Sequence, residues 1–347
     1  LSKEGDVSSP FSKSYIPYLD GFRALSVLLV MFWHYHISLY LPGPFGVTTF
    51  FFISGFLITT LLLREQKANG IGLARFWLRR LARLWPPLVL LVVVCCAVMS
   101  YQGGFPETSE VFAALFYYTN YYRLGADQTL LSDMWGPLWS LSVEEHFYLA
   151  YPLLLMAVGL NKKRQLLVIG ALIIVPLLIR MFNFYILDAY MRNYVSTETR
   201  IDNIAWGCLF ALMPEVSRKA IFTRLRWWVI AATCVLLASS FYIYEHEFSY
   251  VYIHTVQSFC LFVLFGVFFY SEKFKAFYGL LESRVFRYVG KISYEVYLWH
   301  MPVYFTVLSI TGDSIERLIA LPITFIISAA AYQILDRPLY HLRKKLR

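Results

Sequence analysis

Long apolar runs, separated by polar segments, recur along the chain from residue 22 to residue 335. Runs of roughly 17–23 residues are long enough to cross a hydrocarbon core of ~30 Å as α-helices. The pattern therefore predicts an all-α fold, a polytopic transmembrane helical bundle of about ten helices. The predicted spans are 22–41, 45–63, 85–101, 138–160, 166–187, 203–214, 227–244, 251–270, 289–310 and 315–335, of which 203–214 is the shortest.

Two segments between these runs have a different pattern. Residues 71–84 place Arg75, Arg79 and Arg83 at helical positions i, i+4 and i+8, on one face. This spacing predicts a helix at the cytoplasmic surface that leads into two consecutive prolines, where a new helix can begin. Residues 102–137 are too many for a simple turn, and they predict an interfacial or re-entrant element on the outer side.

The composition agrees with a membrane protein, because 59% of the 347 residues are hydrophobic and only 15% are charged. A soluble domain of this size has too little interior for that apolar surface, so lipid must cover the rest. The net charge of +9 would suit nucleic acid, but basic residues of membrane proteins collect in cytoplasmic loops. We therefore expect membrane lipids and no nucleic acid as partners. The expected location is the plasma (inner) membrane, with multiple passes and both termini cytoplasmic.

The remaining composition predicts neither a metal site nor a second domain. The cysteines fall inside apolar runs without the paired spacing of zinc or redox motifs, which indicates packing residues; they are Cys95, Cys96, Cys208, Cys234 and Cys260. The first apolar run ends in a polar, aromatic stretch instead of a small-residue cleavage site, so we expect it to remain as a helix. Residues 1–347 are expected to form a single transmembrane domain with no fused soluble domain.

Ionisable groups inside a bilayer are costly, which makes each of them a functional candidate. At 1.5 Å per residue, His34 lies ~18 Å from the cytoplasmic boundary and Glu144 ~21 Å, in a core of ~30 Å. Ser54 and His300 come to ~16–18 Å by the same count. Four polar side chains from four helices are therefore expected to lie at one depth, in a shared site.

Arg23 and His34 are eleven residues apart, close to three helical turns, so they are expected to project from one face together with Asp20. Histidine suits general-base work, and a carboxylate partner can hold its tautomer. Glu144 or Glu145 is the expected partner, and only one of them is expected to face His34 because adjacent helical residues point about 100° apart. The alternatives are an arginine that snorkels to the boundary and a histidine that packs against a neighbouring helix.

Arg79, Arg80 and Arg83 lie together on the expected cytoplasmic side. Guanidinium groups hold phosphate oxygens by paired hydrogen bonds, which makes these residues candidates for a phosphate-binding group. Anionic lipid headgroups are the alternative ligand, because basic segments beside membranes attract acidic lipids generally.

Six segments, taken in order, resemble the membrane acyltransferase-3 family over almost the whole chain. The first carries the family's Arg-x10-His signature as Arg23 and His34, the third its Arg-x-x-Arg pair as Arg80 and Arg83, and the fourth its characteristic glutamate as Glu144. The segments are YLDGFRALSVLLVMFWHY, GVTTFFFISGFLIT, FWLRRLARLWPP, PLWSLSVEEHFYLAYPLLL, TRIDNIAWGCLFAL and GKISYEVYLWHMPV, and LDRPLY resembles the family's Glu-Arg-Pro ending.

Three positions depart from the family pattern. Thr48 stands where an acidic residue is common, His146 replaces the usual glutamine, and Asp336 replaces glutamate in the final motif. The first departure weakens any role for a carboxylate on the second span, and the other two keep polar character.

The resemblance implies an enzyme that moves an acyl group, most often acetyl, from cytoplasmic acyl-coenzyme A to a hydroxyl of a carbohydrate or lipid-linked glycan. It implies donor binding by Arg80 and Arg83, with Arg79 beside them. His34 would act as general base with Glu144, and direct transfer and a transient acyl-histidine both remain open. Arg23 is expected to bind the donor or steady His34, without a metal. The residues expected to support the site or the acceptor are Asp20, Ser54, Glu145, Arg200, Asp202 and His300, and the matching segment near His300 also contains Ser293 and Tyr297.

Two other classes of protein fit the buried polar residues. A proton-coupled transporter or flippase would use His34, Glu144 and His300 as a proton relay. A scaffolding membrane protein would use the basic clusters for orientation alone. The absence of an inverted repeat and the Arg-x-x-Arg motif favour the acyltransferase, whose acyl group, acceptor and oligomeric state the sequence does not specify.

Overall fold

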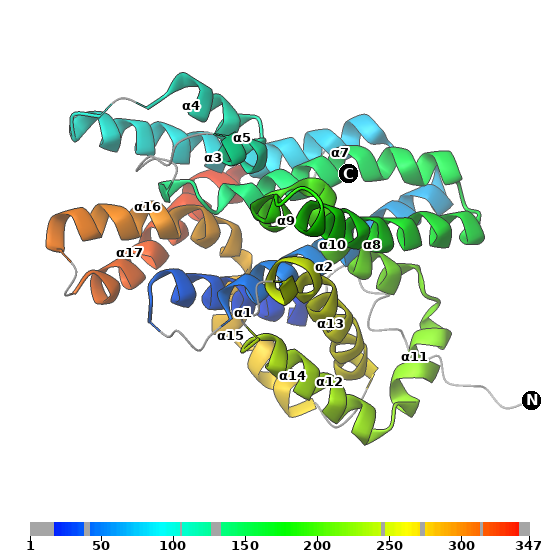
Figure 1. Ribbon diagram of the computed structural model, residues 1–347. Helices are drawn as coiled ribbons and strands as arrows, with labels where there is room; N and C mark the ends of the chain where they lie inside the picture. The colour runs from blue at the N-terminus through cyan, green and yellow to red at the C-terminus, as the bar shows by residue number, and fades with distance from the viewer. Residues whose placement is uncertain are drawn as a thin grey trace, which may run out of the picture.

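The computed structural model describes residues 17–37, 42–104, 106–125, 133–243, 247–270, 275–312 and 315–339. Its regular structure is helical, and no residue in these ranges lies in a strand (Figure 1). The all-α prediction is confirmed. The helices are α1 Pro17–His34, α2 Gly43–Ala68, α3 Leu73–Tyr101, α4 Thr108–Leu115, α5 Thr119–Gly125, α7 Leu138–Val158, α8 Lys162–Tyr185, α9 Tyr190–Val195, α10 Thr197–Leu212, α11 Glu215–Arg224, α12 Trp227–Ser240, α13 Ile253–Tyr270, α14 Lys275–Leu281, α15 Arg284–Lys291, α16 Ser293–Thr311 and α17 Glu316–Ala331.

Within the described ranges, five helices are long and apolar enough to cross a membrane: α2, α3, α8, α13 with the π-helical turn before it, and α17 with the turn after it. The α11 and α12 pair, bent by 91°, makes a sixth if it forms one span. These helices fit a multi-pass membrane protein, but the predicted number of ten spans is not confirmed. The difference falls on α1, α7, α10 and α16, which carry ionisable residues of interest and are not among the candidate spans.

The predicted break between a surface helix at 71–84 and a span at 85–101 is wrong, because α3 runs without interruption through Pro86 and Pro87. Prolines remove backbone donors, and a membrane helix tolerates them where neighbouring groups satisfy the backbone nearby. The Tyr294 hydroxyl donates to the Leu84 carbonyl at 2.7 Å and so fastens α16 to α3 just before the two prolines. The arginines of the predicted surface helix are therefore rigidly continuous with a membrane-crossing helix.

The segment 102–137 contains two short helices in its described part. The lengths of α4 and α5 are eight and seven residues, too short to cross a membrane, which agrees with an interfacial or re-entrant element. Residue 105 and residues 126–132 of this segment lie outside the described ranges.

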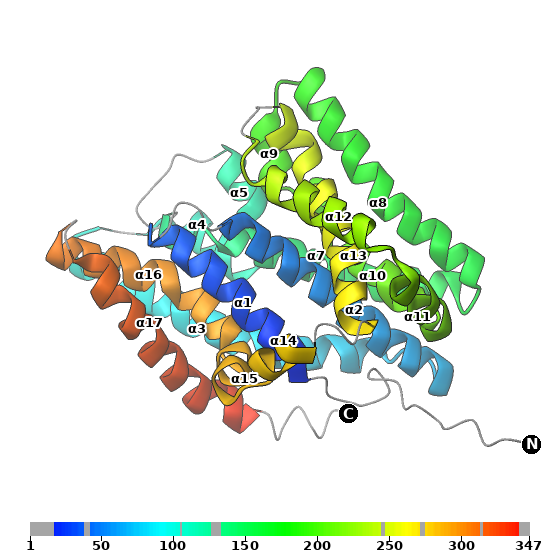
Figure 2. The same ribbon diagram turned by 90° about the horizontal axis from the view of Figure 1, so that it is seen from below.

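Helix α2 lies at the centre of the packing, between α1 on one side and α10 on the other. Two glycines allow its close approach to α10. A Cβ atom on Gly55 would overlap the Ile204 carbonyl oxygen, and one on Gly207 would overlap the Phe52 carbonyl oxygen. The α16 and α17 pair lies on the opposite side of α1 and α2 from α8 (Figure 2). Helix α2 therefore contacts α1, which packs against α16, on one side, and α10, which packs against α8, on the other.

Candidate functional site

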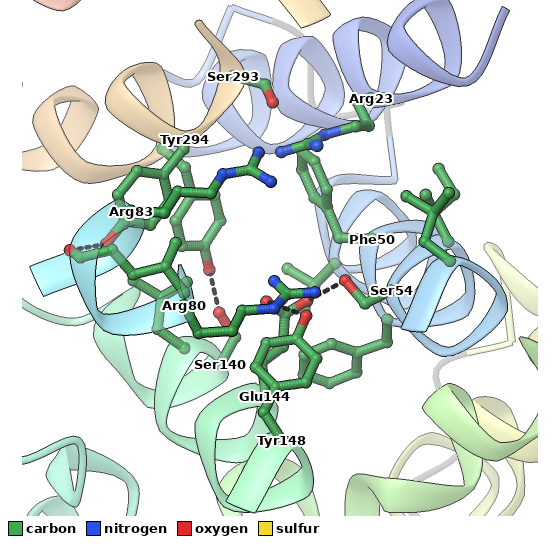
Figure 3. A pocket seen from close by; sticks show the side chains of 17 residues that line it. Arg23, Phe50, Ser54, Arg80, Arg83, Ser140, Glu144, Tyr148, Ser293 and Tyr294 are labelled. Carbon is green, nitrogen blue, oxygen red and sulfur yellow. Dashed lines mark hydrogen bonds between the residues drawn. The ribbon is translucent and has the colours of Figure 1, made fainter. Parts of the chain in front are cut away.

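A cavity of ≈ 80 Å³ lies among α1, α2, α3, α7 and α16 (Figure 3). Three arginines line it, and we call it the arginine cavity. Among the residues that line it, Glu144 is the one carboxylate, so the ionised side chains give a net positive charge. The polar lining residues are Arg23, Ser54, Arg80, Arg83, Ser140, Glu144, Tyr148, Ser293, Tyr294 and Tyr297.

Glu144 and Arg80 occupy one side of the arginine cavity. The Ser54 hydroxyl donates to Oε1 of Glu144 at 2.9 Å, and the Tyr148 hydroxyl lies 3.4 Å from its Oε2 atom. The Arg80 guanidinium lies 4.1 Å from the centroid of the Tyr148 ring. The indole of Trp77 donates to the Tyr148 carbonyl at 3.1 Å and so fastens α3 to α7. These contacts fix the cation and the carboxylate side by side.

Arg23 and Arg83 point toward one another from opposite sides of the arginine cavity (Figure 3). Within the part of the chain that the structure describes, the buried Nε atom of Arg23 and the buried Oγ atom of Ser293 have no hydrogen-bond partner. Buried donors without partners are costly, and two facing guanidinium groups repel each other. An anion that accepts hydrogen bonds would relieve both costs, so the arginine cavity is chemically suited to bind one.

Two residues predicted for this region lie away from the lining. Arg79 forms an ion pair with Glu65, with 2.6 Å between Nη2 and Oε1. Asp20 lies in the first turn of α1, where its backbone touches Gly290 of α15. Of the three arginines predicted to bind the donor, the structure brings Arg80 and Arg83 into the cavity and places Arg79 outside it.

A second cavity, of ≈ 240 Å³, contains His34 in its wall, and we call it the histidine cavity. Aromatic side chains dominate its lining, together with one cation and one carboxylate. Burial lowers the pKa of the Arg123 guanidinium, while the charge of Asp133 opposes the shift. The Arg123 side chain donates to the Gly136 carbonyl at 2.9 Å. The principal lining residues are Trp33, His34, Arg123, Asp133, Trp139, Tyr194, Tyr297, Met301 and Phe305.

Hydrogen bonds determine the tautomers of His34 and His300. Nδ1 of His300 lies 2.7 Å from the Tyr297 carbonyl, which can only accept, so this nitrogen carries a proton. In the neutral ring Nε2 of His300 is then an acceptor, and it lies 3.1 Å from Nδ1 of His34. Nδ1 of His34 must therefore donate, which leaves Nε2 of His34 with the lone pair that a general base needs.

The expectation that Glu144 contacts His34 is not met, because the two residues line different cavities. His34 pairs with His300, and Glu144 pairs with Ser54. The four side chains predicted to share one depth thus form two pairs. His34, the last residue of α1, lines the histidine cavity together with Pro137 and Trp139 at the start of α7. Glu144 lies six residues after Leu138, the first residue of α7, or ~9 Å further along the helix at 1.5 Å per residue.

The remaining candidates lie outside both linings. The Arg200 guanidinium lies 5.1 Å from the Trp139 ring and 5.6 Å from the Tyr194 ring, behind the aromatic wall of the histidine cavity. Asp202 forms a fully buried ion pair with Arg180 at 2.8 Å. These contacts indicate that Arg200 and Asp202, both on α10, stabilise the fold.

Glu145 follows Glu144 on α7 but does not line either cavity. Its Oε1 atom is buried and has no hydrogen-bond partner among the described residues. Adjacent helical residues point in different directions, as expected. Glu144 thus lines the cavity with the predicted arginines, whereas Glu145 lies behind the lining, near the charge of Arg80.

The two cavities are stacked along four helices. On α1 and α16, Arg23 and Ser293 line the arginine cavity, and residues further along each helix line the histidine cavity. On α2 and α7 the order is reversed, because these helices run the opposite way. Val47 and Tyr297 line both cavities and form the partition between them.

Several lining residues escaped the sequence reasoning. Trp139 and Ser140 stand in a segment already recognised as PLWSLSVEE, where that match was the available signal. Arg123 and Asp133 lie in the long segment before α7, and Tyr194 lies on the short helix α9. No periodic pattern marks these three positions, because the fold alone brings them to His34. Among the described residues, no group of three or more His, Cys, Asp or Glu side chains is placed to hold a metal ion.

Comparison with known proteins gives consistent matches. A family model described as an acyltransferase domain matches residues 16–333. The chain is 31% identical to "Putative O-acetyltransferase SACOL0978" of Staphylococcus aureus strain COL, over 93% of this chain and 57% of that protein. It is also 31% identical to "O-acetyltransferase OatA" of Staphylococcus aureus strain NCTC 8325, over 84% of this chain and 51% of that protein. The chain thus spans about half the length of the curated relatives it matches. No solved structure matches.

Proposed function

This chain belongs to the acyltransferase-3 family, and from that premise we propose that it is an integral membrane O-acetyltransferase. The proposed donor is acetyl-coenzyme A or another acyl-coenzyme A on the cytoplasmic side of the plasma membrane. The proposed acceptor is a hydroxyl of a carbohydrate or lipid-linked glycan. The observation that carries this proposal is the stacking of the arginine cavity and the histidine cavity along the same four helices.

The arginine cavity supports the assignment of the donor side. Coenzyme A carries phosphates, and Arg80 and Arg83 offer guanidinium groups for paired, charge-assisted hydrogen bonds. The cavity measures only ≈ 80 Å³, which suits the narrow thioester end of the donor better than its nucleotide. We therefore place the nucleotide at the mouth, with its phosphates on the arginines, and the thioester arm directed along the helices toward His34. Both termini would then be cytoplasmic.

The histidine cavity supports the assignment of the acceptor side. Flat aromatic rings such as those of Trp33 and Trp139 can stack on the apolar faces of a sugar ring, and Arg123 and Asp133 can bond its hydroxyls. The lining combines apolar faces with a small number of polar groups that fix orientation, as carbohydrate recognition requires. A glycan hydroxyl held here would lie beside the free Nε2 atom of His34.

The proposed transfer is direct. His34 Nε2 accepts the proton of the acceptor hydroxyl while that oxygen attacks the thioester carbonyl carbon. A C–O bond forms, the C–S bond breaks, and the proton passes from His34 to the departing thiolate, which leaves as free coenzyme A. His300 acts as a positioning residue, because its Nε2 atom accepts a hydrogen bond from Nδ1–H of His34 in both the neutral and the protonated form of His34.

The test uses the purified chain in detergent with radiolabelled acetyl-coenzyme A in a single turnover, quenched in the presence and absence of an acceptor sugar. Direct transfer predicts label on the sugar and none on the protein. Label on the protein in the absence of acceptor would instead indicate an acyl-histidine intermediate. If no label leaves coenzyme A with any hydroxyl acceptor, and envelope glycans from cells with and without the protein have equal acyl content by mass spectrometry, the proposed function is wrong.

A further inference from the structure

We propose that the side chain of Val47, in the partition between the two cavities, limits the length of the acyl group that the enzyme transfers. The inference rests on the proposed function and adds a determinant of donor specificity. It concerns an apolar side chain, whereas the roles proposed so far belong to charged, polar and aromatic groups.

The route of the acyl group follows from the stacking of the cavities. The thioester arm enters from the arginine cavity, and the attacking hydroxyl lies beside His34 in the histidine cavity. Val47 of α2 and Tyr297 of α16 are the two residues that line both spaces. The acyl carbonyl must therefore reach the level of these two side chains before it meets the hydroxyl.

The Tyr297 side of the partition is held in place. Its hydroxyl lies 2.6 Å from Oγ of Ser140 and 3.0 Å from the Pro137 carbonyl oxygen, both at the start of α7. Its ring also makes an edge contact with Phe50, with 6.1 Å between the ring centroids. Movement of Tyr297 would break two buried hydrogen bonds, so the ring cannot readily move aside for a larger acyl group.

The Val47 side is held through its backbone. The preceding residue, Gly46, lies so close to α1 that a Cβ atom there would approach the Ser26 carbonyl oxygen and the Val30 side chain. Val47 itself is 7% exposed, and a β-branched side chain in a helix has one strongly preferred rotamer. Because neither the backbone nor the rotamer can readily adapt, the volume of this side chain determines the width of the partition.

The experiment compares kcat/KM for acetyl-, propionyl- and butyryl-coenzyme A in the wild-type chain and the variants Val47→Ala and Val47→Ile. One methylene against a close-fitting apolar wall changes selectivity by roughly 10- to 200-fold. Val47→Ala should therefore raise the ratio of propionyl to acetyl transfer by about tenfold or more. Val47→Ile should lower propionyl and butyryl transfer more than acetyl transfer.

The matched control is Val92→Ala, which removes the same atoms from a buried valine of α3 that lines neither cavity. Its ratio of propionyl to acetyl transfer should equal that of the wild type. If Val47→Ala does not fold, Val47→Ile still tests the role of Val47. A narrower partition should lower kcat/KM for propionyl- and butyryl-coenzyme A more than for acetyl-coenzyme A.

An unchanged ratio in a folded and active Val47→Ala chain, or equal losses for all donors in Val47→Ile, would overturn the assignment of Val47. Either result would leave the proposed acyltransferase intact, because acetyl transfer would still be observed. Failure of the wild-type chain to use any acyl-coenzyme A would instead remove the proposed function, and this inference with it.

Discussion

Nδ1 of His34 lies 3.1 Å from Nε2 of His300, so the end of α1 is hydrogen-bonded to the middle of α16 through two imidazole rings. The Tyr297 carbonyl anchors the second ring at 2.7 Å and fixes the direction of the hydrogen bonds. A carboxylate partner would place a full negative charge beside the histidine ring, as in the Ser-His-Asp arrangement. The neutral partner here holds the orientation and tautomer of His34, as the carboxylate of such a triad does, but without the negative charge that would stabilise the imidazolium.

His34→Ala should abolish acyl transfer while leaving donor binding nearly unchanged. Loss of a positioned general base costs roughly 10²- to 10⁴-fold in rate. The arginine cavity does not include His34, so the affinity for coenzyme A should stay within about twofold of the wild type. Transfer to an acceptor sugar and titration calorimetry with coenzyme A would measure the two effects separately. A parallel loss of both would mean that the cavities are not functionally distinct.

His300 should affect kcat through the hydrogen bond to His34, and the comparison of two variants isolates that bond. His300→Phe keeps a ring but removes the acceptor, whereas His300→Gln places an amide oxygen near the former Nε2 position. One hydrogen bond contributes about 1 kcal/mol, so kcat should fall roughly fivefold to tenfold in His300→Phe and recover partly in His300→Gln. KM for the donor should not change. Equal activity of the two variants would contradict a positioning role.

Arg80→Ala and Arg83→Ala should each raise KM for the acyl donor. Hydrogen bonds to charged groups contribute about 1.5–3 kcal/mol, which corresponds to roughly a 10- to 100-fold change. Arg79→Ala is the matched control on the same helix, because Arg79 pairs with Glu65 and lies outside the arginine cavity. Steady-state kinetics with acetyl-coenzyme A would measure the three variants. An effect of Arg79→Ala as large as the other two would show that general positive charge, and not the cavity, binds the donor.

The sequence predicted the helical class and much of the arginine cavity. All three of its arginines, Ser54 and Glu144 were candidates. Arg23 and Glu144 stood out because ionisable groups are rare in apolar runs, Ser54 because of its depth, and Arg80 and Arg83 because guanidinium groups beside a membrane can hold phosphate. The pairing between helices was less predictable. Depth counted from span boundaries placed His34 level with Glu144. In the structure His34 lies near the start of α7, and Glu144 lies six residues after the first residue of that helix. The partner of His34 depends on helix packing, which no local pattern encodes.

Asp202→Asn should destabilise the fold, because Asp202 and Arg180 form an ion pair with 0% exposure of both side chains. Asp202 also accepts from the Thr255 hydroxyl at 2.9 Å, so the loss leaves a buried guanidinium without its charge partner. Such a loss costs about 3–5 kcal/mol, whereas a partly exposed pair contributes about 0–1 kcal/mol.

The control for Asp202→Asn is Glu198→Gln, which disrupts an ion pair with Arg192 whose side chains are 28% and 48% exposed. The thermal midpoint in detergent should fall strongly in Asp202→Asn and hardly at all in Glu198→Gln. Replacing Arg180 by Met together with Asp202 by Leu should recover much of the loss, because an apolar pair of similar size leaves no buried charge. Equal midpoints for Asp202→Asn and the wild type would mean that the pair on α8 and α10 does not stabilise the fold. A midpoint that stays low in the double variant would mean that hydrogen bonds from Arg180 to the backbone carry the stability instead.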